Sequence, residues 1–172
     1  MTGRVLVAGV GNLFLGDDGF GPEVARRLAE QQPPLPGRVT VVDYGIRGMH
    51  LAYDLLAGYD ALVLVDALPG RDASGQVVVL RVTAGDLTAG DAGGGDPGAG
   101  DLGGGFDAHG MDPAAMLAGV ARLGGTLPAT YLVGCRVARV DEEIGLSGPV
   151  AAAVPAAMDA VRELVSSLNG RD

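Results

Sequence analysis

The sequence predicts a single α/β domain in which a mostly parallel sheet lies between helices. Short apolar runs alternate along the chain with helix-length amphipathic stretches, as expected for strands that are buried on both faces. The length of 172 residues matches one domain, and the 48% hydrophobic content is enough to fill its core. We therefore expect one domain over residues 1–172.

Five apolar runs, rich in valine and leucine, are predicted as strands. They span residues 5–9, 39–43, 61–67, 77–82 and 130–135. The run at 77–82 follows its predecessor through a short segment that runs from Gly70 to Gly75. Because a parallel crossover needs more residues than this, we expect 77–82 to be an antiparallel strand at the edge of the sheet.

Helices are predicted between these runs, at about 22–29, 49–57, 113–123 and 148–168. Pro22 suits the first turn of a helix, where its missing N–H costs nothing. Asp112 and Pro113 open the third helix, and Ser147 is expected to cap the last one.

Residues 85–105 differ from the rest of the chain. They contain ten glycines in 21 residues, four aspartates at a spacing of five, and no lysine or arginine. We predict a flexible insert within the domain, because too few apolar side chains are present to offset the entropy of ordering. Calcium binding is the alternative, although the spacing matches neither an EF-hand loop nor a nine-residue β-helix repeat.

The composition excludes several classes of function. The net charge is −9, and no basic stripe is present that could bind the phosphates of a nucleic acid. Cys135 is the single cysteine, so no disulfide can form within the chain, and a cytoplasmic setting fits best. No uncharged apolar stretch reaches the length of a membrane span.

The glycine-rich loop at 9–21 leaves the first strand and enters a helix, where open α/β sheets bind ligands. It is a poor dinucleotide fingerprint, because Phe14 stands where the third glycine of GxGxxG belongs. Asp17 and Asp18 would also repel a pyrophosphate. The simplest alternative is that these two acids cap the helix that follows.

Asp66 ends a strand that is apolar enough to be central, and its carboxylate needs a partner there. Arg71 or backbone N–H groups could supply one. His109 directly precedes a predicted helix, where it could project to the same edge of the sheet. If Asp18, Asp66 and His109 converge, they form a mixed nitrogen and oxygen donor set that suits zinc or nickel.

Serine or cysteine nucleophiles are poorly supported, since no GxSxG motif is present and Cys135 ends an apolar strand.

Five segments together resemble one family, the maturation endopeptidases of nickel-iron hydrogenases. They are VLVAGVGNLFLGDDGFGPEVARRL, DYGIRGMHL, LVLVDALPG, FDAHGMDPAAML and LVGCRVARVDEEIGLSGPVAAAV. The resemblance runs through both halves of the chain in order and omits only the insert. It implies a five-stranded twisted sheet between helices, and an enzyme that trims a carboxyl-terminal extension from the hydrogenase large subunit.

The resemblance also implies roles for single residues. The metal-contacting acids of the family fall on Asp18 and Asp66, and its histidine falls on His109. Gly45 and Gly48 match a glycine-rich block that could bind an extended substrate tail. The nickel is expected to arrive with the precursor large subunit rather than to be held permanently, and the enzyme is expected to be a monomer.

Two roles for the nickel remain open in this interpretation. It could polarise the scissile carbonyl or a water molecule while an aspartate assists proton transfer, or it could chiefly position the cleavage site. Two other hypotheses are a nucleotide-binding module and a non-enzymatic maturation adaptor that senses metal.

Overall fold

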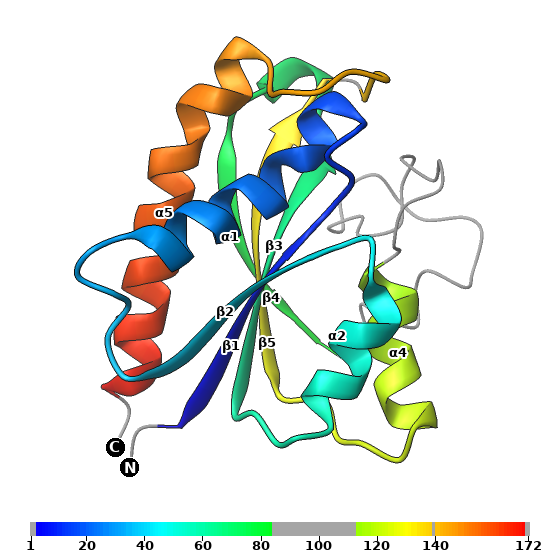
Figure 1. Cartoon of the computed structure of the whole chain (residues 1–172), viewed down its shortest axis with the longest axis vertical. Helices are drawn as coiled ribbons and strands as arrows, with labels where there is room; N and C mark the ends of the chain where they lie inside the picture. Colours follow the sequence, from blue (N-terminus) through cyan, green and yellow to red (C-terminus); the bar gives the residue numbers. More distant parts are fainter. Residues whose placement is uncertain (1–2, 84–112, 139, 171–172) are drawn as a thin grey trace.

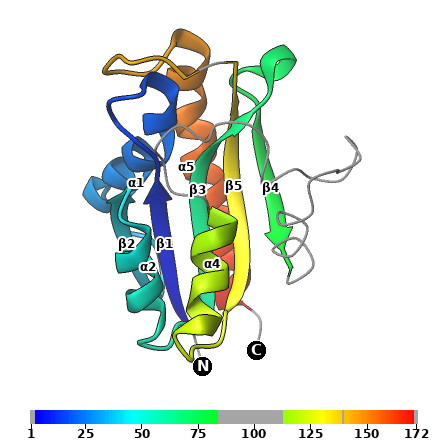
Figure 2. The same ribbon diagram turned by 90° about the vertical axis from the view of Figure 1, so that its right-hand side faces the viewer.

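The computed structural model describes residues 3–83, 113–138 and 140–170. In these residues one five-stranded sheet lies between two layers of helices (Figures 1 and 2). The strand order is β2-β1-β3-β5-β4. The strands are β1 (Arg4–Val10), β2 (Arg38–Gly45), β3 (Ala61–Pro69), β4 (Val77–Val82) and β5 (Ala129–Val137).

The pairing of the strands confirms the predicted sheet. β1 pairs in parallel with both β2 and β3, and β3 pairs in parallel with β5. β4 is antiparallel to β5 and lies at the edge of the sheet. The chain between β3 and β4 holds only a three-residue 3-10 helix, η2 (Arg71–Ala73), so it cannot cross over the sheet to give a parallel strand.

Helices cover both faces of the sheet. α1 (Phe20–Glu30) and α5 (Gly148–Asn169) lie on one face, and α2 (Gly48–Leu55) and α4 (Pro113–Arg122) lie on the other (Figures 1 and 2). Successive residues of β1 point to opposite faces, so Val5 and Val7 join the core under α1 and α5, while Leu6 and Ala8 join the core under α2 and α4. All four side chains are almost completely buried.

The order of the strands creates a crevice beside β1. The chain leaves β1 through α1 to reach β2 on one side, and then passes through α2 on the opposite face to reach β3 on the other side. The carboxyl ends of β1 and β3 meet at this reversal, where Gly9 is in register with Val65. Open α/β sheets bind their ligands at such a switch point.

Close packing of α1 fixes the position of the loop above this crevice. Gly21 of α1 lies directly against the backbone of β1 and β3, where a Cβ atom would collide with the carbonyl oxygens of Val10 and Val65. Gly9 approaches Gly21 equally closely from the β1 side. These two positions therefore require glycine, and they hold the start of α1 against the sheet.

The segment 85–105 lies outside the described residues, so its expected flexibility stays a prediction. Within the described part of the chain, no helix combines the length and the apolar character that crossing a membrane would need.

Candidate functional site

The loop between β1 and α1 folds back on itself through short backbone hydrogen bonds. The Leu15 N–H donates to the Asn12 carbonyl at 3.1 Å, and the Asp18 N–H donates to the Leu15 carbonyl at 3.1 Å. Gly11 has φ +140°, and a side chain there would collide with the Asp18 carbonyl. The loop ends in a 3-10 helix, η1 (Gly16–Gly19), which carries both aspartates of the sequence motif.

Asp18 lies at the inner side of this loop. Its carboxylate oxygen Oδ2 accepts a hydrogen bond from the Asn12 N–H at 2.8 Å, and the side chain is half-buried. Burial raises the pKa of the Asp18 carboxyl, and the bond from Asn12 opposes that rise only in part. The environment of this acid therefore disfavours its charged form.

Asp66 follows the buried part of β3 at the same edge of the sheet. Its Oδ1 accepts the N–H of the next residue, Ala67, at 2.8 Å. Burial raises the pKa of Asp66 well above its ordinary value, and the negative charge of Asp18 raises it further. Asp18 and Asp66 therefore lie within electrostatic reach of each other, 48 residues apart in the sequence. The Arg71 side chain, suggested as a partner for Asp66, lies outside what the structure describes.

The third residue of the predicted set, His109, also lies outside the described residues. Where the chain is described, no group of three histidine, cysteine, aspartate or glutamate side chains is placed to hold a metal ion. The complete ligand set therefore stays a prediction, of which the structure describes the two carboxylates.

The glycines predicted to bind substrate border the first loop. Gly45 ends β2 with φ +55°, and its carbonyl accepts the Gly11 N–H at 3.0 Å. Gly48 begins α2 two residues after the exposed side chain of Ile46. The turn between β2 and α2 is thus hydrogen-bonded to the loop that carries Asp18, as the shared edge of the sheet predicts.

The alternative role as a helix cap is wrong for both aspartates. α1 has no side-chain cap, because its N-cap residue is Gly19. Asp17 instead accepts two hydrogen bonds from Ser147, one from the backbone N–H at 2.7 Å and one from the hydroxyl at 2.8 Å. The Ser147 hydroxyl consequently makes no capping bond within α5, although Ser147 is the N-cap residue as predicted.

Cys135 is enclosed in the core and is fully buried. Burial, with a smaller contribution from the charge of Asp17, raises the pKa of the Cys135 thiol to about 11. A neutral, inaccessible thiol is a poor nucleophile, which agrees with the interpretation of Cys135 as a small core residue.

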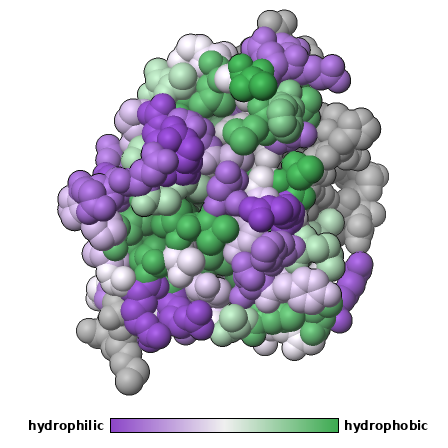
Figure 3. All heavy atoms as spheres, viewed as in Figure 1, coloured by the Kyte–Doolittle hydropathy of each residue, from purple (hydrophilic) through white to green (hydrophobic). Residues whose placement is uncertain are grey.

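Five large apolar side chains are exposed on the segments at the carboxyl end of the sheet, which also carries the two acids. They are Leu13, Phe14, Ile46, Met49 and Ile144. We call this set the apolar rim. In Figure 3, apolar and hydrophilic surfaces lie next to each other at the upper end of the molecule, where the loop after β1 meets the segment before α5.

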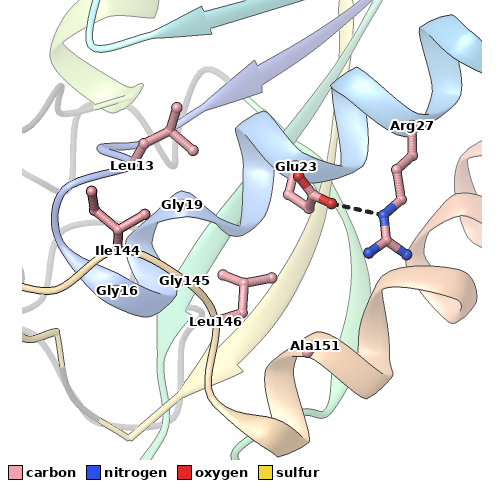
Figure 4. A pocket seen from close by; sticks show the side chains of 9 residues that line it. All are labelled: Leu13, Gly16, Gly19, Glu23, Arg27, Ile144, Gly145, Leu146 and Ala151. Carbon is pink, nitrogen blue, oxygen red and sulfur yellow. Dashed lines mark hydrogen bonds and ion pairs between the residues drawn. The ribbon is translucent and has the colours of Figure 1, made fainter.

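A cleft of about 320 Å³ lies between these two segments. Leu13, Ile144 and Leu146 line it on the loop side, and Glu23 of α1 pairs with Arg27 at 2.7 Å along its wall (Figure 4). The cleft adds a recess, partly apolar, between η1 and the segment before α5.

Known proteins resemble this chain in both sequence and fold. No protein-family model matches the sequence. Hydrogenase 2 maturation protease of Escherichia coli K12 is 39% identical over 79 residues, which cover 45% of this chain and 47% of the relative. The Rhodobacter capsulatus formation protein HupD is 37% identical over 78 residues, 45% of this chain and 36% of the relative. The chain thus spans about half the length of these curated relatives, or less.

Longer matches cover nearly the whole chain. The solved structure of the E. coli hydrogenase maturating endopeptidase HybD aligns with a TM-score of 0.75 at 26% identity, over 95% of this chain and 93% of that one. A Methanocaldococcus jannaschii protein assigned to the hydrogenase maturation proteases is 30% identical over 161 residues, 91% of this chain and 93% of the relative. The chain belongs to the hydrogenase maturation protease family.

Proposed function

We propose that this protein is an endopeptidase that removes the carboxyl-terminal extension of a nickel-iron hydrogenase large subunit after nickel has been inserted. One observation carries the proposal. Asp18 and Asp66 form an electrostatically coupled pair at the switch point of the sheet, on two of the segments that resemble the family. The printed names of the relatives support the reaction class.

The chemistry of the donor set favours a divalent cation. Two half-buried carboxylates that repel each other are stabilised when a positive charge lies between them. Each acid accepts a backbone N–H from the loop or strand that carries it, and within the described part of the chain its other oxygen accepts no hydrogen bond. With His109 as the third ligand, the set contains the nitrogen and oxygen donors that suit nickel.

The nickel in this proposal belongs to the substrate. A precursor that carries its metal would be held by Asp18, Asp66 and His109, whereas a precursor without metal would lack that contact. Bound in this way, the ion could polarise the scissile carbonyl or a water molecule, or it could chiefly hold the cleavage site in place. Burial raises the pKa of both carboxyls, which makes each a stronger base than an exposed aspartate for accepting a proton from an attacking water.

The surface around the acids suits a protein substrate. The apolar rim offers contacts that would be buried by a folded partner, and exposed apolar residues clustered around a site mark protein interfaces. Gly45 and Gly48 border the same site, where we expect them to contact an extended tail, although both backbone groups of Gly45 already bond to Gly11 and Asp43 within the protein. We expect the protein to act as a monomer on this precursor.

A cleavage assay with two forms of the precursor tests the proposal. The nickel-loaded precursor should lose the mass of its extension, and the nickel-free precursor should stay intact. Asp18→Ala, Asp66→Ala and His109→Ala should each abolish trimming. Asp60→Asn is the matched control, because Asp60 also accepts a backbone N–H but lies at the opposite end of the sheet.

Two outcomes would contradict the proposal. Cleavage that is equally fast without nickel would remove the role of the metal. Formation of a stable complex with the nickel-loaded precursor, without any change in its mass, would instead support the adaptor hypothesis.

A further inference from the structure

Asp17 is a charged side chain that the protein buries although the proposed chemistry does not use it. Only 8% of its surface is exposed, and in the described part of the chain no other charged side chain is buried. A buried carboxylate is costly unless donors satisfy it. Ser147 supplies two of them, from a position 130 residues further along the chain.

The partner of Asp17 is itself unusual. An N-cap serine ordinarily accepts a hydrogen bond from the first turn of its own helix. Ser147 makes no such bond and directs its hydroxyl to Asp17. The amino terminus of α5 carries a partial positive charge, which further favours a carboxylate at this place. The start of α5 is thus arranged to hold the Asp17 side chain.

This contact fixes the turn that carries Asp18. Asp17 and Asp18 are consecutive residues of η1, and the Gly16 N–H adds a second link by donating to the Glu143 carbonyl at 2.7 Å. On the inner side of the turn, Asp18 accepts the Asn12 N–H at 2.8 Å. η1 is therefore held from the α5 side by Asp17, while Asp18 faces the sheet edge.

We propose that Asp17 is a positioning residue, which anchors η1 to the start of α5 and so holds the Asp18 carboxylate opposite Asp66. The effect on cleavage rests on the proposed function, whereas the effect on the loop does not. Because Asp17 is buried and lies behind η1, it should not touch the substrate itself, and losing its contact should slow cleavage only through the placement of Asp18.

The test uses Asp17→Asn and Ser147→Ala, with Asp60→Asn as the control. We expect Asp17→Asn to lower kcat about tenfold or more, since small misplacements of reacting groups have large effects, and to change KM only as far as the displaced Asp18 weakens its contact with the nickel. Ser147→Ala keeps the backbone donor and should lower kcat less. Ser147→Thr, which restores a hydroxyl, should recover most of the rate. Asp60→Asn should leave both constants near those of the unmodified protein.

A second measurement does not depend on activity. The Asn12 amide reports on Asp18 directly, so its hydrogen exchange should become about tenfold faster in both Asp17→Asn and Ser147→Ala. The Val7 amide, inside β1, should keep its protection. Ser147→Ala is the sharper variant here, because the change lies far from Asn12 in sequence.

The outcomes separate the two proposals. If the unmodified protein fails to cleave the precursor, the proposed function fails, and faster exchange at Asn12 would still support the role of Asp17. If kcat and the exchange of Asn12 both stay unchanged while thermal stability falls, Asp17 is a structural residue only, and the inference is overturned. If Asp17→Asn does not fold, Ser147→Ala decides between these results.

Discussion

The aspartates at the two ends of the central sheet lie in opposite electrostatic environments. At the amino end, the Asp60 carboxylate accepts the Arg4 N–H at 2.7 Å. The Arg4 guanidinium in turn donates to the carbonyls of Ala57 and Gly58 and covers the Tyr59 ring at 4.6 Å. At the carboxyl end, Asp18 and Asp66 repel each other, and each carboxylate accepts one backbone N–H.

This difference distinguishes an aspartate that stabilises the fold from two aspartates whose placement suits a functional site. The acid at the amino end is exposed and accepts a backbone N–H, so it adds to stability at little cost. The acids at the carboxyl end are half-buried as a like-charged pair, which lowers stability unless a cation or a proton neutralises one of them. Uncompensated charge of this kind is typical of functional sites.

The largest expected effect is on activity. Asp66→Asn should lower the rate of precursor trimming at pH 7 by about a hundredfold or more, because the asparagine amide binds a metal ion poorly and does not act as a base. Asp60→Asn should change the rate less than threefold. The measurement is the initial rate of cleavage followed by mass spectrometry. Equal losses in both variants would mean that the two ends do not differ in function.

The next effect is on stability and has the opposite sign. Asp66→Asn should raise the free energy of unfolding at pH 7 by about 1 kcal/mol, because it removes a half-buried charge next to Asp18. The pKa of Asp66 is higher in the folded than in the unfolded protein, so the folded state binds more protons. Stability of the unmodified protein therefore falls as the pH rises from the unfolded pKa, about 4, through the folded one.

Urea unfolding at several pH values measures this effect. The two proteins should be about equally stable below the unfolded pKa of Asp66, where its side chain is neutral in both states. The advantage of Asp66→Asn should then grow with pH and level off above the folded pKa. An advantage that does not depend on pH would show that charge is not the cause.

A smaller loss is expected at the amino end. Asp60→Asn weakens the hydrogen bond that the Arg4 N–H donates to the Asp60 carboxylate at an exposed position. The free energy of unfolding at pH 7 should fall by about 0.5–1 kcal/mol. The same urea experiment measures it. A gain in stability would contradict the contrast between the two ends.

The sequence predicts the fold well because its strands are defined locally. The runs around Leu64 and Val133 are apolar at nearly every position, and their short length with valine enrichment favours strands buried on both faces. The short connection before β4 likewise fixes its direction. The ends of elements were less accurate: β3 continues to Pro69, because its last residues pair with β5 beyond the apolar run.

The site is predictable only in part. Asp18 and Asp66 follow neighbouring parallel strands, so the shared edge of the sheet brings them together. The role of Asp17 was missed, because a bond to Ser147 depends on how η1 packs against the start of α5. No local pattern distinguishes an aspartate that caps its own helix from one that binds the start of another helix 130 residues away.

The smallest effect concerns Cys135, which reports on the same end of the sheet from inside the core. Burial and the charge of Asp17 raise the pKa of its thiol to about 11, so only about one thiol in a thousand is ionised at pH 8. Alkylation by iodoacetamide in the native protein should therefore be slow. Asp17→Asn removes the charge and should speed labelling a few-fold at high pH, whereas Asp60→Asn should not. Equal labelling in the two variants would mean that the charge of Asp17 does not reach the core, and that the contrast between the ends is confined to the surface.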